Sequence, residues 1–188
     1  MLTKYAADTS RWENWQKEYR YGAMLIIPPD PPLLGMEMLR RRYDPKAQAI
    51  CGTHISLTVP FPRPLSDDNW YEMKSIAAGI EPFTVKYGPL INYLPAPGVC
   101  LAIEPFAALD NLRAALEKAA AFKGALLRKY PFSPHMTIAE YITRDYTREL
   151  MEKLKDKTPS GSFFCSSVSY HVPDDKFHFT ERGRFDFA

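Results

Sequence analysis

The 188-residue sequence contains only three cysteines, Cys51, Cys100 and Cys165, and they lie far apart. An odd number of widely spaced cysteines forms neither a disulfide framework nor a Cys/His zinc cluster, so we expect buried free thiols in a reducing compartment. No apolar run approaches the roughly 18 residues of a membrane-spanning helix, and residues 1–21 lack the apolar stretch of a signal peptide. The sequence therefore predicts a cytoplasmic protein with no membrane partner.

Charge of one sign and glycine-rich loops are also missing. The 24 basic and 22 acidic residues leave a formal net charge of +2, whereas capture of a nucleic-acid duplex usually needs a strongly basic face. A small anion or a nucleic-acid end remains possible. The nine glycines are scattered and form no glycine-rich phosphate loop. The basic cluster at residues 40–42 is interpreted as a solvated helix end rather than a phosphate clamp.

Apolar residues make up 46% of the sequence. This is enough to form the buried core of one domain or of two small lobes. Apolar periodicity, caps and breakers predict helices over residues 9–20, 33–43, 66–79, 110–130 and 145–157. They predict strands over residues 21–28, 50–59, 83–94, 98–104, 135–142, 162–172, 176–180 and 184–187. This order has no regular parallel rhythm, so it favours an α+β fold with antiparallel pairing and two related halves.

Two stretches, "THISLTV" and "PHMTIAE", share one plan, in which a histidine is followed two positions later by a hydroxyl residue. Side chains at i and i+2 of a strand lie on one face, so His54, Ser56 and Thr58 are predicted to share a face. His135 and Thr137 are predicted to do the same in the second stretch. Four histidines would give about 0.4 such pairs by chance, so the repetition indicates function.

Two imidazoles on one cleft supply what phosphodiester cleavage needs without a metal or a cofactor. A neutral imidazole accepts a proton from the attacking group, and an imidazolium donates one to the leaving oxygen. Ser56 and Thr137 would hold the non-bridging oxygens. Which of His54 and His135 is the base stays open. The alternatives are a module that binds a nucleotide without turnover, a metal-dependent hydrolase with both histidines as ligands, and histidines that only satisfy buried hydrogen bonds.

Three further residues are candidates at the edge of this site. His178 also has a hydroxyl residue two positions on, but a turn follows, so a surface role is favoured over a ligand contact. His171 lacks such a partner, and we expect it to be a structural histidine with satisfied hydrogen bonds. Tyr141 continues the alternation from His135 and could line the cleft, stacking on a base or ribose, with core packing as the alternative.

The paired motifs, the "MLIIPP" strand, the "RRRYDP" helix end and the closing short strands resemble the 2H phosphoesterase superfamily. Its members include RNA 2',3'-cyclic phosphodiesterases, historically called 2'-5' RNA ligases. The resemblance runs from about residue 21 to the C-terminus. It implies two antiparallel-sheet lobes related by a pseudo-twofold, flanking helices and a central cleft. By position, it implies that His54 and His135 are catalytic and that Ser56 and Thr137 bind the phosphate.

The resemblance also implies a function: hydrolysis of a cyclic 2',3'-type or 2'-linked phosphodiester of a nucleotide or RNA end, as in RNA processing. The sequence does not fix the oligomeric state, and we take a monomer as the default. The exact substrate stays open. Many RNA-acting members have an arginine soon after the second motif, where this chain has Glu140, which favours a smaller phosphodiester. Residues 21–188 would form the 2H domain. Residues 1–20 would be a helical extension, with Trp12, Trp15 and Tyr19 packing on the domain rather than stacking on bases.

Overall fold

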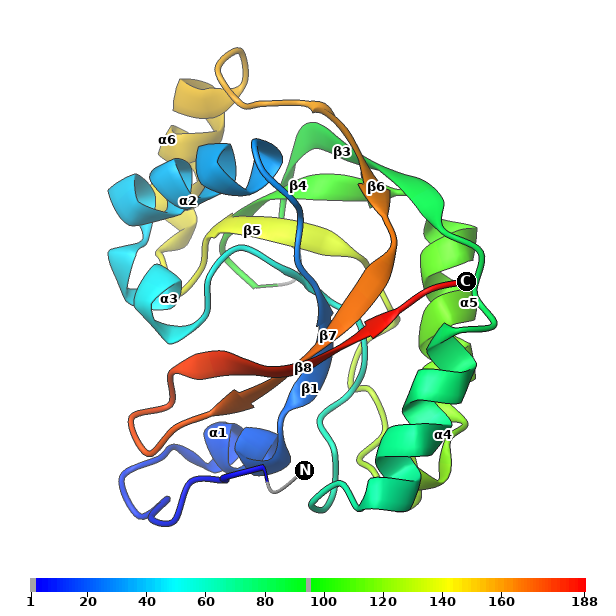
Figure 1. Ribbon diagram of the computed structural model, residues 1–188. Helices are drawn as coiled ribbons and strands as arrows, with labels where there is room; N and C mark the ends of the chain where they lie inside the picture. Colours follow the sequence, from blue (N-terminus) through cyan, green and yellow to red (C-terminus); the bar gives the residue numbers. More distant parts are fainter. Residues whose placement is uncertain (1–2, 94–95) are drawn as a thin grey trace.

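The computed structural model describes residues 3–93 and 96–188 and is built around one curled, antiparallel, eight-stranded sheet (Figure 1). The strand order is β6-β3-β4-β5-β2-β1-β7-β8. The strands are β1 Ala23–Ile26, β2 Ile55–Ser56, β3 Phe83–Asn92, β4 Val99–Glu104, β5 His135–Ala139, β6 Gly161–Cys165, β7 Ser167–Pro173 and β8 Phe179–Asp186. The predicted α+β, bilobal fold is confirmed: each half of the sheet has four strands, and the halves meet where β5 pairs with β2.

Helices flank the two sides of this sheet, with α2, α3 and α6 gathered on one side and α4 and α5 on the other (Figure 1). Their bounds are α1 Asn14–Glu18, α2 Pro32–Tyr43, α3 Pro45–Ile50, α4 Asp67–Ala77, α5 Phe106–Glu117 and α6 Arg144–Leu154, with short 3-10 turns η1 Tyr19–Tyr21 and η2 Ala120–Phe122. Helix α4 begins after a Ser66 capping box, as the sequence predicted. Residues 1–2 of the predicted extension and residue 94 of the predicted third strand lie outside the described residues.

The apolar faces of the two motif strands form the centre of the core. Ile55, Leu57, Met136 and Ile138 are all fully buried, as the alternation of both motifs predicted. Burying each such side chain stabilises the fold by about 1.5–3 kcal/mol. The opposite faces of the same strands are therefore held rigidly toward the concave side of the sheet.

The first motif strand is much shorter than predicted. Residues 45–50, where the predicted strand begins, form α3, because Pro45 stands at its first position and the Asp44 carboxylate caps the Ala47 N–H. Pairing also ends early, since the N–H groups of Leu57 and Thr58 both donate to Met24 O.

The prediction that Thr58 shares a face with His54 and Ser56 is wrong. Thr58 is buried, and its hydroxyl oxygen accepts a hydrogen bond from Met24 N. Because β2 ends at Ser56, the strict alternation that the prediction assumed does not reach Thr58. The first motif therefore offers two polar side chains rather than three.

The long helix predicted over residues 110–130 is also wrong in extent. Helix α5 begins at Phe106 and ends at Glu117, and the chain then leaves the helical path. Phe122 is buried and stacks on Phe61 with ring centroids 4.3 Å apart, and Gly124 follows with a φ of 88°. Tertiary packing of one aromatic ring thus outweighs the helix propensity of the alanine-rich sequence, and it frees residues 123–134 to run beside the motifs.

The C-terminal strands divide differently from the prediction. Residues 162–172 form parts of two strands, β6 and β7, while the predicted strands 176–180 and 184–187 are parts of one strand, β8. The expected turn at Gly183 is instead a β-bulge opposite Tyr170. Glycine is needed there because a Cβ atom would lie only 1.9 Å from a ring carbon of Trp70.

Candidate functional site

The two motifs lie side by side because β2 and β5 are adjacent antiparallel strands. Ile55 pairs with Met136, and both side chains point into the core. If this register continues by one residue in each direction, each motif histidine stands opposite the hydroxyl residue of the other motif. Paired residues of an antiparallel ladder share a face, so all four polar side chains lie on the side away from the core.

With the register extended in this way, the four side chains would occupy the corners of a rectangle. His54 faces Thr137 and Ser56 faces His135 across the strands, with about 5 Å between Cβ atoms, while partners on one strand are about 7 Å apart. The histidines therefore stand on diagonally opposite corners and the hydroxyls on the other two. An anion above the centre would meet an imidazole on each of two opposite sides.

Both histidines have the same tautomer. Nδ1 of His54 lies 2.7 Å from Gly52 O, and Nδ1 of His135 lies 2.7 Å from Ser133 O. A carbonyl oxygen only accepts hydrogen bonds, so each Nδ1 must carry its proton. In the neutral form, Nε2 of each ring is the free basic atom, and it can exchange a proton with a ligand.

Both histidines are also biased toward the neutral form. Burial lowers the pKa of His54 to about 4, and the positive charges of Arg40, His171 and His135 act in the same direction, whereas the bond to Gly52 opposes them. Burial likewise lowers the pKa of His135, against the opposing effect of its bond to the Ser133 carbonyl. At neutral pH the unliganded site therefore holds two neutral imidazoles.

The buried Arg40 side chain forms hydrogen bonds with the backbone of both motif segments. The residue is 2% exposed, and its guanidinium donates to Thr137 O (2.7 Å), Cys51 O (3.1 Å) and Gln48 Oε1 (2.9 Å). The interpretation of residues 40–42 as a solvated helix end is therefore wrong for Arg40, although its two neighbours are exposed or partly exposed. Sequence alone could not separate the three arginines, because only the position of β5 decides which one is covered.

The end of β5 is fixed by a second buried charge. Asp44 accepts hydrogen bonds from Ala47 N at 2.9 Å and from Glu140 N at 2.8 Å, one with each carboxylate oxygen. Burial raises the pKa of Glu140, and Asp44 acts in the same direction while Arg40 opposes it. An acidic group that resists ionisation thus lies directly after the last residue of β5.

Glu117, at the end of α5, connects the segments that flank the motifs. One carboxylate oxygen accepts from Val59 N, after the first motif, and from Arg128, before the second, both at 2.8 Å. The other oxygen accepts from Arg113. Arg128 also donates to Leu57 O. This network therefore connects the segment after the first motif strand with the segment before the second.

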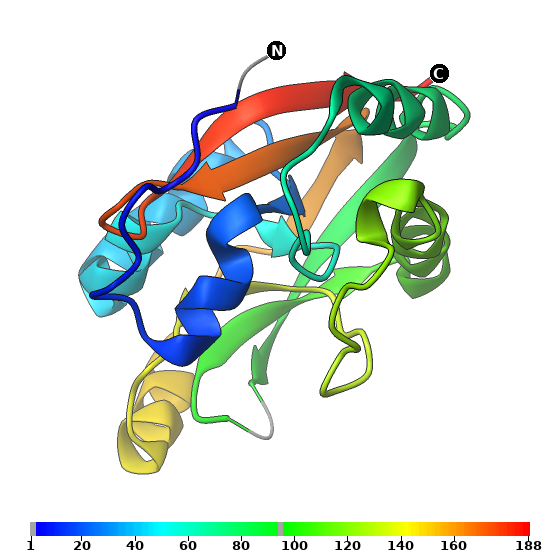
Figure 2. The ribbon, with the colours of Figure 1, turned by 90° about the horizontal axis from the view of Figure 1, so that it is seen from below.

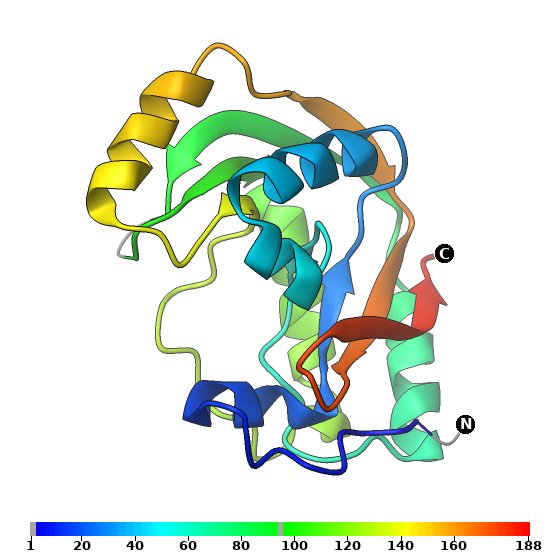
Figure 3. The ribbon, with the colours of Figure 1, turned by 90° about the vertical axis from the view of Figure 1, so that its left-hand side faces the viewer.

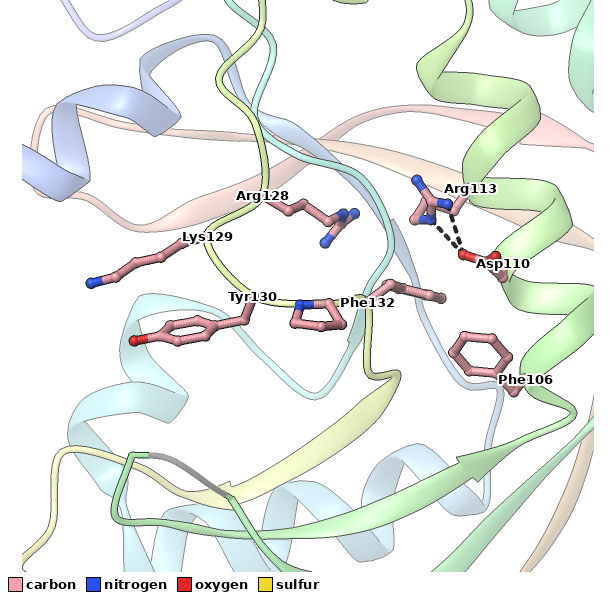
Figure 4. Close-up of a pocket in the computed structure, with 8 residues that line it drawn as sticks. Phe106, Asp110, Arg113, Arg128, Lys129, Tyr130 and Phe132 are labelled. Atoms are coloured by element: carbon pink, nitrogen blue, oxygen red, sulfur yellow. Dashed lines mark hydrogen bonds and ion pairs between the residues drawn. The ribbon is translucent and has the colours of Figure 1, made fainter.

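A cavity of about 500 Å³ lies beside this network, on the segment that leads into β5, rather than at the histidines (Figure 4). Arg128 and Phe132 point toward α5 in this view, whereas Lys129 and Tyr130 point away from it. The two arginines of the cavity are already paired with Asp110 and Glu117. The two carboxylates thus offset the two arginines, and Lys129 adds one further positive charge to the lining.

Of the two remaining histidines, His171 differs from expectation. His171 is not satisfied: both ring nitrogens are buried without a hydrogen bond, and Nε2 lies 3.8 Å from a carboxylate oxygen of Glu181. Burial lowers its pKa to about 4, with Glu181 opposing that effect. His178 stands on the β7–β8 hairpin, with Nδ1 3.9 Å from Asp174 Oδ2, so its contact with a ligand stays a prediction. No short motif marks His171, which reaches the region of His54 only through the sheet.

Aromatic side chains adjoin the second motif. Tyr93 was missed by the sequence analysis, yet its ring centroid lies 4.5 Å from that of His135. Tyr141 lies beyond the end of β5, with a φ of 55°, so the strand alternation does not extend to it. The ring of Tyr141 lies 6.2 Å from that of Trp15, and its role in lining the cleft stays a prediction.

Within residues 3–93 and 96–188, there is no group of three or more His, Cys, Asp or Glu side chains arranged to hold a metal ion. In the same residues no helix has the length and apolar character needed to cross a membrane. Cys100 and Cys165 are buried free thiols, and Cys51 is partly buried.

Known proteins are similar to this chain in sequence. A profile of the 2'-5' RNA ligase superfamily matches residues 28–176. A Bacillus cytotoxicus protein, whose name proposes a phosphoesterase activity, is 30% identical over 145 residues, which cover 74% of this chain and 76% of that protein. A similarly named Oceanobacillus iheyensis protein is 27% identical over 120 residues, covering 62% of this chain and 68% of that protein.

Solved structures share the fold at low sequence identity. E. coli LigT in complex with 3'-AMP superimposes with a TM-score of 0.59 at 17% identity, covering 88% of this chain and 97% of LigT. TT0787 of Thermus thermophilus gives a TM-score of 0.55 at 13% identity, covering 87% of this chain and 96% of that protein. The profile match, the relatives and the fold agree with the paired histidine motifs, and the chain therefore belongs to the 2'-5' RNA ligase superfamily of 2H phosphoesterases.

Proposed function

We propose that this phosphoesterase is a metal-independent phosphodiesterase that opens a cyclic 2',3'-type phosphodiester, or cleaves a 2'-linked one, at a nucleotide or RNA end. The observation that carries the proposal is the pairing of β2 with β5 at Ile55 and Met136, which supports a site where the two imidazoles and two hydroxyls act on one phosphate. E. coli LigT has been crystallised with 3'-AMP, ATP and NADP+, which supports a nucleotide as the ligand of this shared fold.

The proposed reaction is an in-line displacement by water. One neutral imidazole takes a proton from the water as its oxygen bonds to phosphorus, and an imidazolium gives a proton to the ribose oxygen as the P–O bond breaks. Ser56 and Thr137 donate hydrogen bonds to the non-bridging oxygens, where negative charge increases in the transition state. Diagonal positions of His54 and His135, as the extended register implies, would put base and acid on opposite sides of the phosphorus.

We assign the base role to His54 and the acid role to His135. Three cationic or protonatable neighbours, Arg40, His171 and His135, add to burial in disfavouring a proton on His54. For His135, by contrast, burial lowers the pKa without a contribution from neighbouring cations. A bound phosphate anion raises the pKa of both rings. His135, with fewer opposing charges, is then the first to become an imidazolium.

Turnover of a substrate panel in EDTA tests the activity. The panel contains 2',3'-cyclic nucleotides, an RNA with a cyclic phosphate end and a 2'-5'-linked dinucleotide, each with wild type, His54→Ala and His135→Ala. We expect wild-type turnover in EDTA and a loss of about 10²- to 10⁴-fold in each variant, the usual contribution of one acid or base. A chelator-sensitive activity would instead support metal catalysis.

A substrate with a 4-nitrophenyl leaving group separates the two roles, because that leaving group departs without a proton. The activity of His135→Ala should recover on this substrate relative to wild type, whereas that of His54→Ala should not. Recovery of His54→Ala alone would reverse the assignment. Nucleotide binding without turnover of any substrate in the panel would favour the non-catalytic binding module.

A further inference from the structure

The segment before the matched region is docked on the domain rather than free. The match to the superfamily profile begins at residue 28. Ala7 N donates to a carboxylate oxygen of Asp175 at 2.8 Å, and Trp12 Nε1 donates to Asp175 O at 3.0 Å. The Trp12 ring also meets Phe177 edge-on, with centroids 5.0 Å apart. These contacts fix the chain before α1 against the β7–β8 hairpin.

Helix α1 lies between this hairpin and the segment that leads into β5, as Figures 2 and 3 both show. Trp15 in α1 contacts one residue from each half of the sheet. Its ring is perpendicular to that of Phe177 at 5.3 Å, and it lies 6.2 Å from Tyr141 with an interplanar angle of 32°. Tyr141 comes directly after Glu140, just beyond the second motif strand. Trp15 therefore brings an aromatic ring to the end of the second motif strand from outside the matched region.

Both ring partners of Trp15 have an uncommon backbone conformation. Tyr141 has a φ of 55° and Phe177 a φ of 65°, and they are the non-glycine residues with positive φ among those that the structure describes. Such conformations are uncommon for bulky side chains and persist where the surroundings impose them, often at ligand sites. The two strained residues thus flank the same indole ring.

The Trp15 and Tyr141 rings are in direct contact in the unliganded structure, so a nucleobase would have to part them. A base stacked between two rings takes up about 3.4 Å on each side, so the rings would stand about 6.8 Å apart. The observed separation is 6.2 Å, and Trp15 is 37% and Tyr141 60% exposed. A sandwich site therefore forms only if the two partly exposed rings move apart and become parallel.

The charges around Tyr141 favour a neutral ligand over a second phosphate. Burial and the carboxylates of Glu140, Glu13 and Asp44 act together to raise the pKa of Tyr141. One cation, Lys46, lies 5.8 Å from the ring centroid. This surplus of acidic groups would repel a continuing RNA backbone, while a nucleobase with amino donors would meet hydrogen-bond acceptors.

We propose that Trp15 and Tyr141 form a nucleobase clamp, which holds the base of the nucleotide whose phosphate lies over the motif histidines. This inference rests on the proposed function for the position of the phosphate. Tyr93, with its ring centroid 4.5 Å from that of His135, adds a further aromatic side chain beside the proposed phosphate subsite. The site therefore recognises a single terminal nucleoside rather than a run of RNA.

Binding of 3'-AMP and of inorganic phosphate, measured separately by calorimetry, tests the clamp. The variants are Trp15→Ala, Trp15→Phe and Tyr141→Leu, with Tyr71→Ala as the control because Tyr71 is an exposed aromatic residue of α4. Trp15→Ala and Tyr141→Leu should weaken 3'-AMP binding by about 5- to 150-fold, the range for loss of one base stack. Phosphate binding should not change, and Trp15→Phe should retain most of the affinity for 3'-AMP.

Two results would overturn the clamp. One is unchanged 3'-AMP affinity in Trp15→Ala and Tyr141→Leu. The other is an equal loss of 3'-AMP and phosphate binding in both variants, which would mean that the rings only support the fold. Failure of the proposed function has a different signature: 3'-AMP binding that depends on Trp15, together with wild type that turns over no phosphodiester in the panel.

Discussion

Replacing Arg40 with methionine should weaken the connection between the two motif strands and lower the stability of the protein more than a substitution of an exposed arginine. Methionine fits the long, buried channel of the side chain but has no donors. The substitution leaves the carbonyl oxygens of Thr137 and Cys51 without the charged donors that they have at 2.7 and 3.1 Å. One of these carbonyls belongs to the second motif and the other precedes the first motif.

The magnitude follows from the number of groups left unsatisfied. A buried polar group without its partner costs about 1–3 kcal/mol, so two carbonyls together cost about 2–5 kcal/mol after partial relaxation. Domains of this size are stable by about 5–15 kcal/mol, so the variant should still fold. Because Arg40 also lowers the pKa of His54, its loss should raise that pKa.

Urea denaturation of Arg40→Met, with Arg41→Met as the matched control, checks this prediction. Arg41 is the next residue of the same helix, is exposed and pairs across the surface with Glu37, so its loss should cost at most about 1 kcal/mol. NMR titration of the His54 ring in both variants gives the pKa. Equal stability of the two variants would refute the argument that Arg40 ties the motifs together.

Other predictions concern the pH dependence of stability and the replacement of two glycines. Burial lowers the pKa values of His54 and His171 to about 4, so between pH of about 6.5 and 4 the unfolded chain binds protons that the folded chain does not. The free energy of unfolding should therefore fall as pH falls through this window and stay flat above it, and urea titrations of wild type and His171→Gln should show a shallower fall in the variant. Gly183→Ala should destabilise by about 1–3 kcal/mol through its clash with Trp70, while Gly35→Ala in α2, with open space, should stabilise by up to about 1 kcal/mol, as thermal melts would show.

Local patterns were sufficient wherever neighbouring residues decide the structure. The Ser66 cap of α4 and the alternation of Met136 and Ile138 against His135 and Thr137 were all visible in the sequence, and the structure confirms them. In each case the preference of one segment agrees with its place in the fold. That the two motif strands are neighbours was not predicted from the sequence, and the structure shows it.

The errors arose where distant residues decide the structure. Phe122 leaves the predicted helix because Phe61 offers a stacking partner 61 positions away in the chain, and Arg40 is buried because β5 covers it. His171 reaches the region of His54 through its pairing with Ala23, whose small side chain leaves room. None of these contacts has a short-range signature, since each depends on the order of strands in the sheet.

The duplicated motif has a physical reason in the register of the two central strands. An antiparallel pair has a local twofold through Ile55 and Met136, so the same short motif on both strands places histidine and hydroxyl at alternate corners without further design. Symmetry alone would give two equivalent histidines, whereas acid and base must differ. The surroundings break the symmetry: Arg40 and His171 act on His54, while an aromatic ring, Tyr93, stands against His135. In the proposed mechanism, the sheet would supply the opposed geometry, and the side chains that are not repeated would assign the two roles.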